Sequence, residues 1–516
     1  MPMNTASPKV LFLALDAMDH DLIMQWASAG ILPTFRSLTE RGACGVTRNP
    51  PGLYVGATWP SFFTGVSAAR HGRYCYEQLV TGTYDTPRFL TTDLKRHPFW
   101  SALSAAGRRV AIFDVPKSPL ARDLNGIQLM DWGTHDPDPG APFQTWPSSL
   151  ATTLTDRFGS DPVGDCNEIK RTAAGIEAFC GNLKSRIRTK TTMCKELLSQ
   201  EAWDLLMAVF AESHCVGHQC WALHDDTHPS HDPALAEAVG DPIKEVYVAL
   251  DAAVAELLGT TGQDTTVFVL ASHGMGPHYD ATFMLDEILE RLDPEPQTWT
   301  RRAGVTYRRV WRVLRQRIPG RPRPQMRSPV DHQRCFAVPN NSVHGGIRIN
   351  LVGREPRGRV RRGEECDALF VELRRELLEL VNLDTGQPVV RNLVRAADLY
   401  AGERLDDLPD FFVEWNREAR ISRVSSPRIG TIAKEFRGVR SGDHKPEGFF
   451  WVQGPGIPAG RRIAPVSVMD FAPTVAALLG VSLTAVDGEP IGAILQRQSN
   501  GSEHGTPHTD RGERLA

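Results

Sequence analysis

Three side chains that can bind a metal lie just after strand-like or turn-like segments that are far apart in the chain. Asp16 ends the apolar run 10–15, His273 closely follows the apolar run 265–270, and His444 follows Ser-Gly-Asp. Open α/β sheets place their ligands at the carboxyl ends of the strands, so these groups are expected to meet at one sheet edge. Together they predict a metal site, whereas each one alone also fits a helix cap or a structural hydrogen bond.

A histidine pair adds to this pattern. His214 and His218 are four residues apart, a spacing that places both imidazoles on the same side of a helix. Glu212, two residues before the pair, is a candidate to orient a ligand or to act as a general base. Cys215 and Cys220 offer sulfur ligands, but their spacing from the histidines does not match a zinc finger.

Hydroxyl groups gather in the segment 50–65, at a predicted junction between a loop and a helix. Thr58 lies two residues before Pro60, a pattern typical of a helix start, so we expect a helix over 57–64. Helix N-termini stabilise anions through free amide groups and the helix dipole. Thr58 is therefore either a helix cap or a candidate nucleophile beside a bound anion.

Strand-like and helical segments alternate along the chain and must position these groups. The runs 10–15, 205–210 and 265–270 are predominantly apolar, as in strands buried on both faces of a parallel sheet. A further strand is predicted at 449–452, and helices are predicted at 19–29, 34–41, 175–198, 364–383 and 470–479. This alternation predicts an α/β fold with a doubly wound, mostly parallel sheet.

The chain is longer than such a core requires, so we expect inserted cap segments. The predicted core comprises residues 8–75, 199–284 and 336–495, with a cap insertion at 76–198, a basic insertion at 285–335 and a disordered tail at 496–516. Within the basic insertion, residues 301–327 contain ten arginines and no acidic residue. Such a run is usually a solvated face, and the alternative is a lid that attracts an anionic substrate.

Composition sets further limits on function. The 516-residue chain carries a formal net charge of -3, so we expect no general attraction to nucleic acid or to membranes. Nine scattered cysteines form no regular disulfide framework and fit reduced thiols in the cytoplasm. The N-terminal residues lack the apolar segment of a signal peptide, and no apolar run approaches 18 residues. We therefore predict a cytoplasmic protein without a membrane-spanning helix.

The motifs, in this order, resemble the alkaline phosphatase superfamily, and in particular its branch of type I phosphodiesterases, nucleotide pyrophosphatases and related phosphomutases. The resembling segments are residues 13–16, 59–65, 70–72, 212–221, 272–277, 345–358, 408–410, 441–444, 454–456, 470–474, 479–480 and 487–488. The resemblance implies an alkaline-phosphatase-like core and two divalent metals, usually zinc. By position, His218 and His444 would hold one metal, and Asp16 and His273 would hold the other.

Two of the expected ligands depart from the family pattern. His214 and Ser272 stand where the family has aspartates. Imidazole is also a zinc ligand, so the resemblance still implies one site formed by His214, His218 and His444. A neutral hydroxyl at Ser272 is a poor ligand, so the second ion is expected to bind weakly or not at all. The cofactor is therefore predicted to be one or two divalent ions.

The nucleophile position also departs from the pattern. The family attacks phosphorus with a Ser or Thr, whereas Val55 occupies the corresponding position and cannot attack. Thr58 and Tyr54 are the nearest hydroxyls, and water activated by the metal is the alternative nucleophile.

The resulting prediction is a metal-dependent hydrolase of a small anionic phosphate ester, with a phosphodiester or pyrophosphate-type bond as the reacting group. One alternative is a non-catalytic or single-metal member that binds a ligand. Another is a hydrolase of a different ester, such as a sulfate or a phosphonate, although the sulfatase formylglycine motif is absent near residues 50–65. Phosphomutase activity would need a phosphorylated hydroxyl, which Val55 does not supply.

Overall fold

A nine-stranded sheet forms the centre of the fold in the computed structural model, which describes residues 9–135, 143–293, 330–341 and 343–495. Its strand order is β18-β2-β17-β7-β1-β6-β3-β4-β5. These strands are β1 (Val10–Leu15), β2 (Ala43–Arg48), β3 (Val110–Phe113), β4 (Gly126–Met130), β5 (Gln144–Trp146), β6 (Leu205–Phe210), β7 (Thr266–Ala271), β17 (Glu447–Gln453) and β18 (Arg462–Ser467). Neighbouring strands are parallel except where β17 meets β2 and β7 and where β5 meets β4. The predicted α/β fold with a mostly parallel sheet is confirmed.

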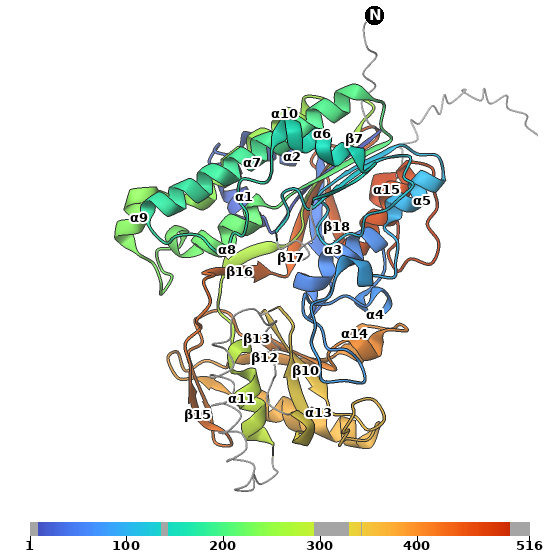
Figure 1. The fold of residues 1–516 in the computed structure, drawn as a ribbon. Helices are drawn as coiled ribbons and strands as arrows, with labels where there is room; N and C mark the ends of the chain where they lie inside the picture. Colours follow the sequence, from blue (N-terminus) through green and yellow to red (C-terminus); the bar gives the residue numbers. More distant parts are fainter. Residues whose placement is uncertain (1–8, 136–142, 294–329, 342, 496–516) are drawn as a thin grey trace, which may run out of the picture.

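Helices cover both faces of this sheet (Figure 1). On one face lie α1 (His20–Ser28), α7 (Ala173–Gln200), α8 (Glu212–His224) and α10 (Pro242–Leu258), and on the other lie α3 (Tyr54–Thr64), α5 (Phe99–Ala105) and α15 (Phe471–Leu478). Leu11 and Leu13 of β1 pack with the first group, whereas Phe12 and Ala14 pack with the second. Because successive side chains of a strand point to opposite faces, burial of both faces explains the uninterrupted apolar run of β1.

Strand positions were predicted more closely than helix ends. The strands predicted at 10–15 and 205–210 coincide with β1 and β6, and β7 is shifted by one residue from its prediction. However, α3 begins at Tyr54 rather than at residue 57, and it continues through Pro60. The helix α13 (Glu364–Leu378) ends five residues before the predicted end at 383, because the chain turns into the short strand β11 (Val381–Asn382).

Residues 76–198 differ from the predicted cap insertion. This segment supplies β3, β4 and β5 to the central sheet, where β3 pairs with β6. Its long helix α7 packs against α10 on one face of the same sheet. The three strands have only three to five residues each. Runs this short carry too little periodicity to be separated from loops by sequence pattern.

A smaller module lies beside the central sheet, at the lower end of the molecule in Figure 1. Its strands β9 (Cys335–Val338), β10 (His344–Ile349), β12 (Val390–Arg395) and β13 (Phe411–Trp415) form an antiparallel sheet, and α11 (Thr282–Leu292) and α13 complete its core. The predicted core segment 336–495 is therefore divided, because its first part lies in this module and the chain returns to the central sheet at β17. The arginine-rich residues 301–327 and the tail 496–516 lie outside the described residues.

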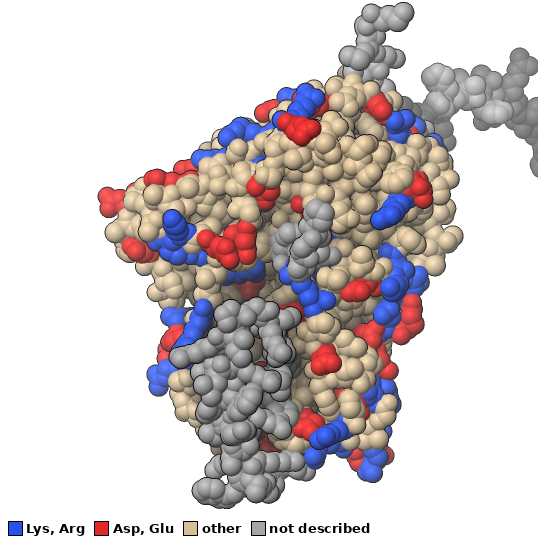
Figure 2. All heavy atoms as spheres, viewed as in Figure 1, with Lys and Arg blue, Asp and Glu red and all other residues tan. Residues whose placement is uncertain are grey.

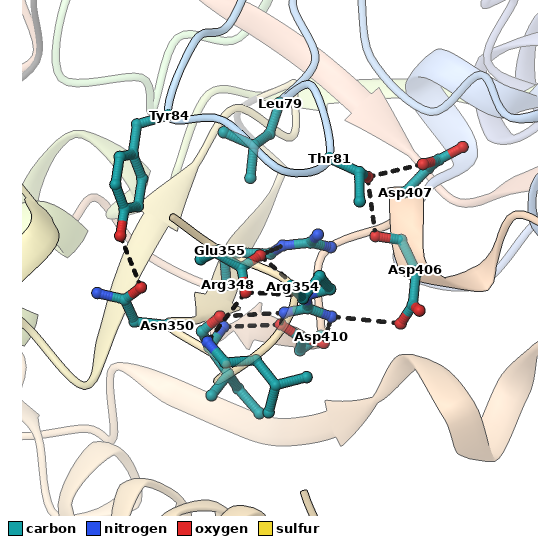
Figure 3. A network of polar contacts seen from close by, with 12 residues as sticks. Leu79, Thr81, Tyr84, Arg348, Asn350, Arg354, Glu355, Asp406, Asp407 and Asp410 are labelled. Atoms are coloured by element: carbon teal, nitrogen blue, oxygen red, sulfur yellow. Dashed lines mark hydrogen bonds and ion pairs between the residues drawn. The ribbon is translucent and has the colours of Figure 1, made fainter. Parts of the chain in front are cut away.

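A network of buried and partly buried ion pairs holds this smaller module together (Figure 3). Arg348 pairs with Glu355 at 2.8 Å in the interior, and the partly buried Arg354 pairs with Asp410 at 2.6 Å. Tyr84 reaches the network from the segment that follows α4 (Ala68–His71) and donates a hydrogen bond to Asn350 at 2.8 Å. Because buried charges are costly unless they are paired, this arrangement accounts structurally for the motif at residues 345–358.

Charged side chains are mixed over the described part of the face in Figure 2, without a large patch of either sign. Within the described residues, no helix combines the length and the apolar character needed to cross a membrane. The nine cysteines are all free thiols.

Candidate metal centre

Three buried imidazoles meet where α8 begins, directly after the carboxyl end of β6. The helix α8 presents His214 and His218, and β16 (Gly442–Lys445), which pairs with β8 (Gly274–Pro277), supplies His444. Ring centroids lie 4.5 Å apart for His214 and His218, 5.0 Å for His214 and His444, and 4.6 Å for His218 and His444. One nitrogen from each ring lies within 4.8 Å of the other two. The structure thus brings these three predicted ligands together in one group, which we call the three-histidine group.

Polar contacts set the orientation of these rings. His218 donates from Nδ1 to the carbonyl of Gly442 at 2.7 Å, so its Nε2 carries a lone pair. His444 Nδ1 lies 3.0 Å from Asp443 Oδ1, a close charge contact without hydrogen-bond geometry. Within the described residues, both ring nitrogens of His444 and Nδ1 of His214 are buried and have no hydrogen-bond partner. Metal-ligating histidines usually place their second ring nitrogen beside a carbonyl or a carboxylate, so the group fits a divalent metal.

The protonation of this group also suits a metal. Burial is the main cause that lowers the pKa of His214 and His218 well below 6.5, and the Arg440 guanidinium lowers it further. The neutral imidazole is the form that coordinates a metal. At neutral pH, no proton therefore has to leave these two rings before an ion binds.

The second predicted ligand pair, Asp16 and His273, is linked by Ser272. Asp16 Oδ1 accepts hydrogen bonds from Trp59 Nε1 at 2.9 Å and from Ser272 Oγ at 3.0 Å. Because the Ser272 hydroxyl donates its only proton to Asp16, it accepts the hydrogen bond from His273 Nδ1, also at 3.0 Å. His273 Nε2 then carries a lone pair, and its ring centroid lies 4.6 Å from that of His444. Within the described residues, neither Asp16 nor His273 belongs to a group of three close metal-ligand atoms, so their role as ligands stays a prediction.

Both hydroxyls that were candidates for the nucleophile are engaged by other groups. Thr58 lies inside α3, so it is not the helix cap, and its Oγ1 lies 3.0 Å from Asn49 Oδ1 and also contacts the carbonyl of Tyr54. Tyr54 donates to the carbonyl of His444 at 3.1 Å, and burial raises the pKa of its phenol. Val55 lies in the first turn of α3 and is partly exposed.

His71, within the 70–72 motif, is a fixed support for α3. Its Nε2 donates to Ser61 Oγ in α3 at 3.0 Å, and its Nδ1 accepts from the backbone N–H of Arg73 at 3.1 Å. Burial, assisted by the Arg73 guanidinium, lowers the pKa of His71 to about 3. The ring is therefore neutral in the folded protein.

This pKa shift predicts a loss of stability in mild acid. Below pH 6.5 the unfolded chain takes up a proton at His71, whereas the folded chain does not until about pH 3. The contribution of His71 to the free energy of unfolding is therefore fully present above pH 6.5, and about 2 kcal/mol of it is lost by pH 5. Between pH 7 and pH 5, the free energy of unfolding measured with urea should therefore fall by about 2 kcal/mol less in His71→Asn than in the native protein. An identical fall in both proteins would contradict this assignment.

Glu212 is held in a buried ion pair. Its Oε1 lies 2.7 Å from Arg186 Nε, and both side chains are at most 1 % exposed. This contact fixes the start of α8 and hence the helix that carries His214 and His218. A general base must reach the reacting group, whereas Glu212 is turned toward Arg186 of α7.

Removing one partner of this pair is expected to destabilise the fold. Glu212→Ala leaves the buried Arg186 with only its longer ion pair to Asp161 at 3.2 Å, which should cost about 3 kcal/mol in urea unfolding. The double variant Glu212→Leu with Arg186→Met removes both charges and should recover most of that loss. Equal losses in the single and double variants would show that the ion pair does not account for the stability of this helix start.

Two residues of the site carried no recognised sequence signal. His135, in the loop after β4, has its ring centroid 4.3 Å from that of His214. Arg440 lies 3.4 Å from His218 Nε2 and donates to His135 Nε2 at 3.1 Å. The signals that would have found them are weak, since His135 follows a strand by five residues and Arg440 immediately precedes the Ser-Gly-Asp-His motif.

A cavity of about 370 Å³ lies beside the three-histidine group. Arg440 forms part of its wall and also contacts His218, so it connects the cavity with the histidines. Arg171 and Arg420 contribute two more positive charges, Asp232 and Asp280 contribute two negative charges, and Phe283 and Phe436 contribute aromatic surface. The three arginines outnumber the two carboxylates, so the cavity suits a molecule with both an anionic and an apolar part.

Comparison with known protein families bears on the fold and on the class of reaction. A family model described as type I phosphodiesterase / nucleotide pyrophosphatase matches residues 10–432. The chain belongs to this family. The family is part of the alkaline phosphatase superfamily, so the predicted resemblance is confirmed. No curated protein matches the sequence.

Members of the type I phosphodiesterase family are typically hydrolases of small phosphate esters and generally use divalent metals. This member keeps a buried group of ligand side chains at the sheet edge, but Ser272 there is a hydrogen-bonding residue between Asp16 and His273. The family match ends before Asp443 and His444, which the structure nevertheless places against His218.

Proposed function

We propose that this chain hydrolyses a phosphodiester or pyrophosphate-type bond with one divalent metal, most suitably zinc, held by His214, His218 and His444. The proposal is supported by the convergence of three buried imidazoles, two of which have nitrogens without a hydrogen-bond partner among the described residues. Three imidazole ligands leave a fourth tetrahedral position open, as catalytic zinc sites require. A metal bound there would polarise a phosphoryl oxygen and lower the pKa of water.

The chain's own residues supply the positioning. Arg440 lies between the histidines and the cavity, so its guanidinium is placed to orient a phosphoryl oxygen. The rest of the substrate would occupy the cavity, whose arginines and phenylalanines favour an anionic leaving group with an aromatic or other apolar part. Asp16, Ser272 and His273 form a hydrogen-bonded row that keeps His273 Nε2 available near His444 as a proton acceptor or a ligand for a weakly bound second ion.

Water is the nucleophile that this geometry favours, because Thr58 and Tyr54 are both engaged with backbone carbonyls. We therefore expect Thr58→Val and Tyr54→Phe to keep phosphodiesterase activity within about threefold of the native protein. Each variant should lose about 1 kcal/mol of stability through its missing hydrogen bond. A fall of several orders of magnitude in one variant, with its folding and metal content intact, would instead identify that hydroxyl as the nucleophile.

The proposal is tested with three chromogenic substrates in parallel. Protein purified without chelator is supplied with zinc and assayed on bis(4-nitrophenyl) phosphate, 4-nitrophenyl phosphate and 4-nitrophenyl sulfate. We expect the diester to react fastest and a chelator to abolish the reaction. Preference for the sulfate would favour the other-ester alternative. Zinc binding without turnover of any substrate would favour a ligand-binding member. The cytoplasmic location stays a prediction from the cysteine content.

A further inference from the structure

A second group of metal-ligand side chains lies next to the three-histidine group. Donor atoms of His135, His214 and Cys215 lie within 4.8 Å of one another. Cys166 Sγ lies 3.1 Å from His135 Nδ1, and Cys215 Sγ lies 3.9 Å from the same nitrogen. We propose that Cys166, Cys215 and His135 form a separate binding site for a thiophilic divalent ion such as zinc, with the fourth position left to water. We call it the thiolate site.

The spacing of the donors supports this proposal. Zinc binds sulfur at about 2.3 Å and imidazole nitrogen at about 2.0–2.1 Å, so neighbouring ligands of a tetrahedral site lie about 3.5 Å apart. The two sulfur-to-nitrogen distances, 3.1 and 3.9 Å, lie on either side of that value. Two thiolates and one imidazole, with water in the fourth position, are also a known ligand set of zinc.

The ligands come from three separate parts of the chain. His135 lies after β4, Cys166 lies between α6 (Ser149–Phe158) and α7, and Cys215 lies in the first turns of α8. Cys166 and Cys215 are 2 % and 1 % exposed, and His135 is partly exposed. An ion at this point would join the loops of the 76–198 segment to the helix that carries the three-histidine group. The thiolate site would thus stabilise the wall beside the proposed catalytic metal.

The positive neighbours of the site are compatible with an ion. Arg186 Nη2 lies 3.5 Å from Cys215 Sγ, but Glu212 and Asp161 pair with its guanidinium at 2.7 and 3.2 Å. Arg440 donates to His135 Nε2, and coordination through Nδ1 would place a proton on that nitrogen. Arg440 would then turn away from His135 toward the cavity that it already lines. Filling the thiolate site therefore releases this arginine for a substrate phosphate.

Cobalt substitution tests the thiolate site separately from the proposed function. Co²⁺ bound by thiolates gives a charge-transfer band in the near ultraviolet, which imidazole ligands alone do not give. Metal-free full-length protein is titrated with Co²⁺, and the band is expected to saturate at about one ion per chain. Cys166→Ser and Cys215→Ser should remove the band and lower the total bound metal by about one ion. His444→Ala should keep it.

Cys180 and Cys220 provide the matched control. These two buried thiols of α7 and α8 contact each other, but within the described residues neither has a contact with His135 like those of Cys166 and Cys215. Cys180→Ser and Cys220→Ser should leave the band unchanged. No thiolate band at saturating Co²⁺ would overturn the proposal, and so would a band that survives both Cys166→Ser and Cys215→Ser. A disulfide between Cys166 and Cys215, seen as two missing thiols under non-reducing conditions, would also overturn it. The proposed function fails in a distinguishable way, because failure of the three-histidine group would appear as a loss of turnover with the band intact.

Discussion

His218→Ala is expected to abolish metal binding at the three-histidine group and to lower phosphodiester hydrolysis by about three orders of magnitude or more. His218 is fully buried, its Nδ1 is fixed by Gly442, and its Nε2 is directed toward the neighbouring imidazoles. Loss of this nitrogen leaves two imidazoles, too few to retain zinc in a catalytic site. Zinc affinity and turnover of bis(4-nitrophenyl) phosphate should therefore fall together.

His224→Ala is the matched control for this variant. His224 lies at the end of the same helix α8, pairs with Asp241 at 2.8 Å and is outside the three-histidine group. Its removal should leave zinc affinity and turnover within about twofold of the native values. Unchanged zinc affinity in His218→Ala, with the thiolate site blocked by Cys215→Ser, would refute the assignment of the ligands.

Ser272→Asp is expected to create the second metal site that the family pattern implies. The introduced carboxylate would face Asp16, whose pKa burial already raises, beside His273 with its available Nε2. Without an ion, two adjacent buried carboxyl groups repel and one must stay protonated. When an ion binds, both carboxylates are ionised and become ligands. We expect bound metal to rise by about one ion per chain, as measured by elemental analysis.

A stability measurement distinguishes this gain from nonspecific binding. The asparagine side chain in Ser272→Asn has nearly the same shape as the aspartate side chain in Ser272→Asp but carries no charge. The melting temperature of Ser272→Asp should therefore rise more steeply with zinc concentration than that of Ser272→Asn. Equal metal content and equal zinc dependence in the two variants would show that the Asp16 and His273 side of the site does not accept an ion.

The central strands and the principal ligands could be predicted because their signals are local. A run such as Val10–Leu15 is apolar at every position, which only a strand or helix buried on all sides explains. His214 and His218 share one helix, so their spacing alone places them together. Asp16 was placed by its strand-end position, and His444 by the Ser-Gly-Asp signal and the family resemblance; the sequence predicted a turn at His444, whereas it lies in β16 because this segment pairs with β8.

Other parts could not be predicted because their positions depend on contacts between distant segments. His135 joins the site only because β4 lies two strands away from β6 in the same sheet, and β4 is a strand of five residues with a partly exposed start. Thr58 was expected at a helix start because Pro60 is common there, whereas the helix begins earlier and accommodates the proline. The role of Ser272 as a bridge between Asp16 and His273 likewise exists only in three dimensions.

Anomalous diffraction from crystals of the protein with bound zinc, recorded on both sides of the zinc absorption edge, would locate the metal directly. We expect an anomalous peak about 2.0–2.1 Å from one nitrogen each of His214, His218 and His444. The thiolate site, if filled, would give a separate peak near Cys215. Absence of a peak among the three histidines at saturating zinc would contradict the proposed metal centre and, with it, the proposed hydrolysis.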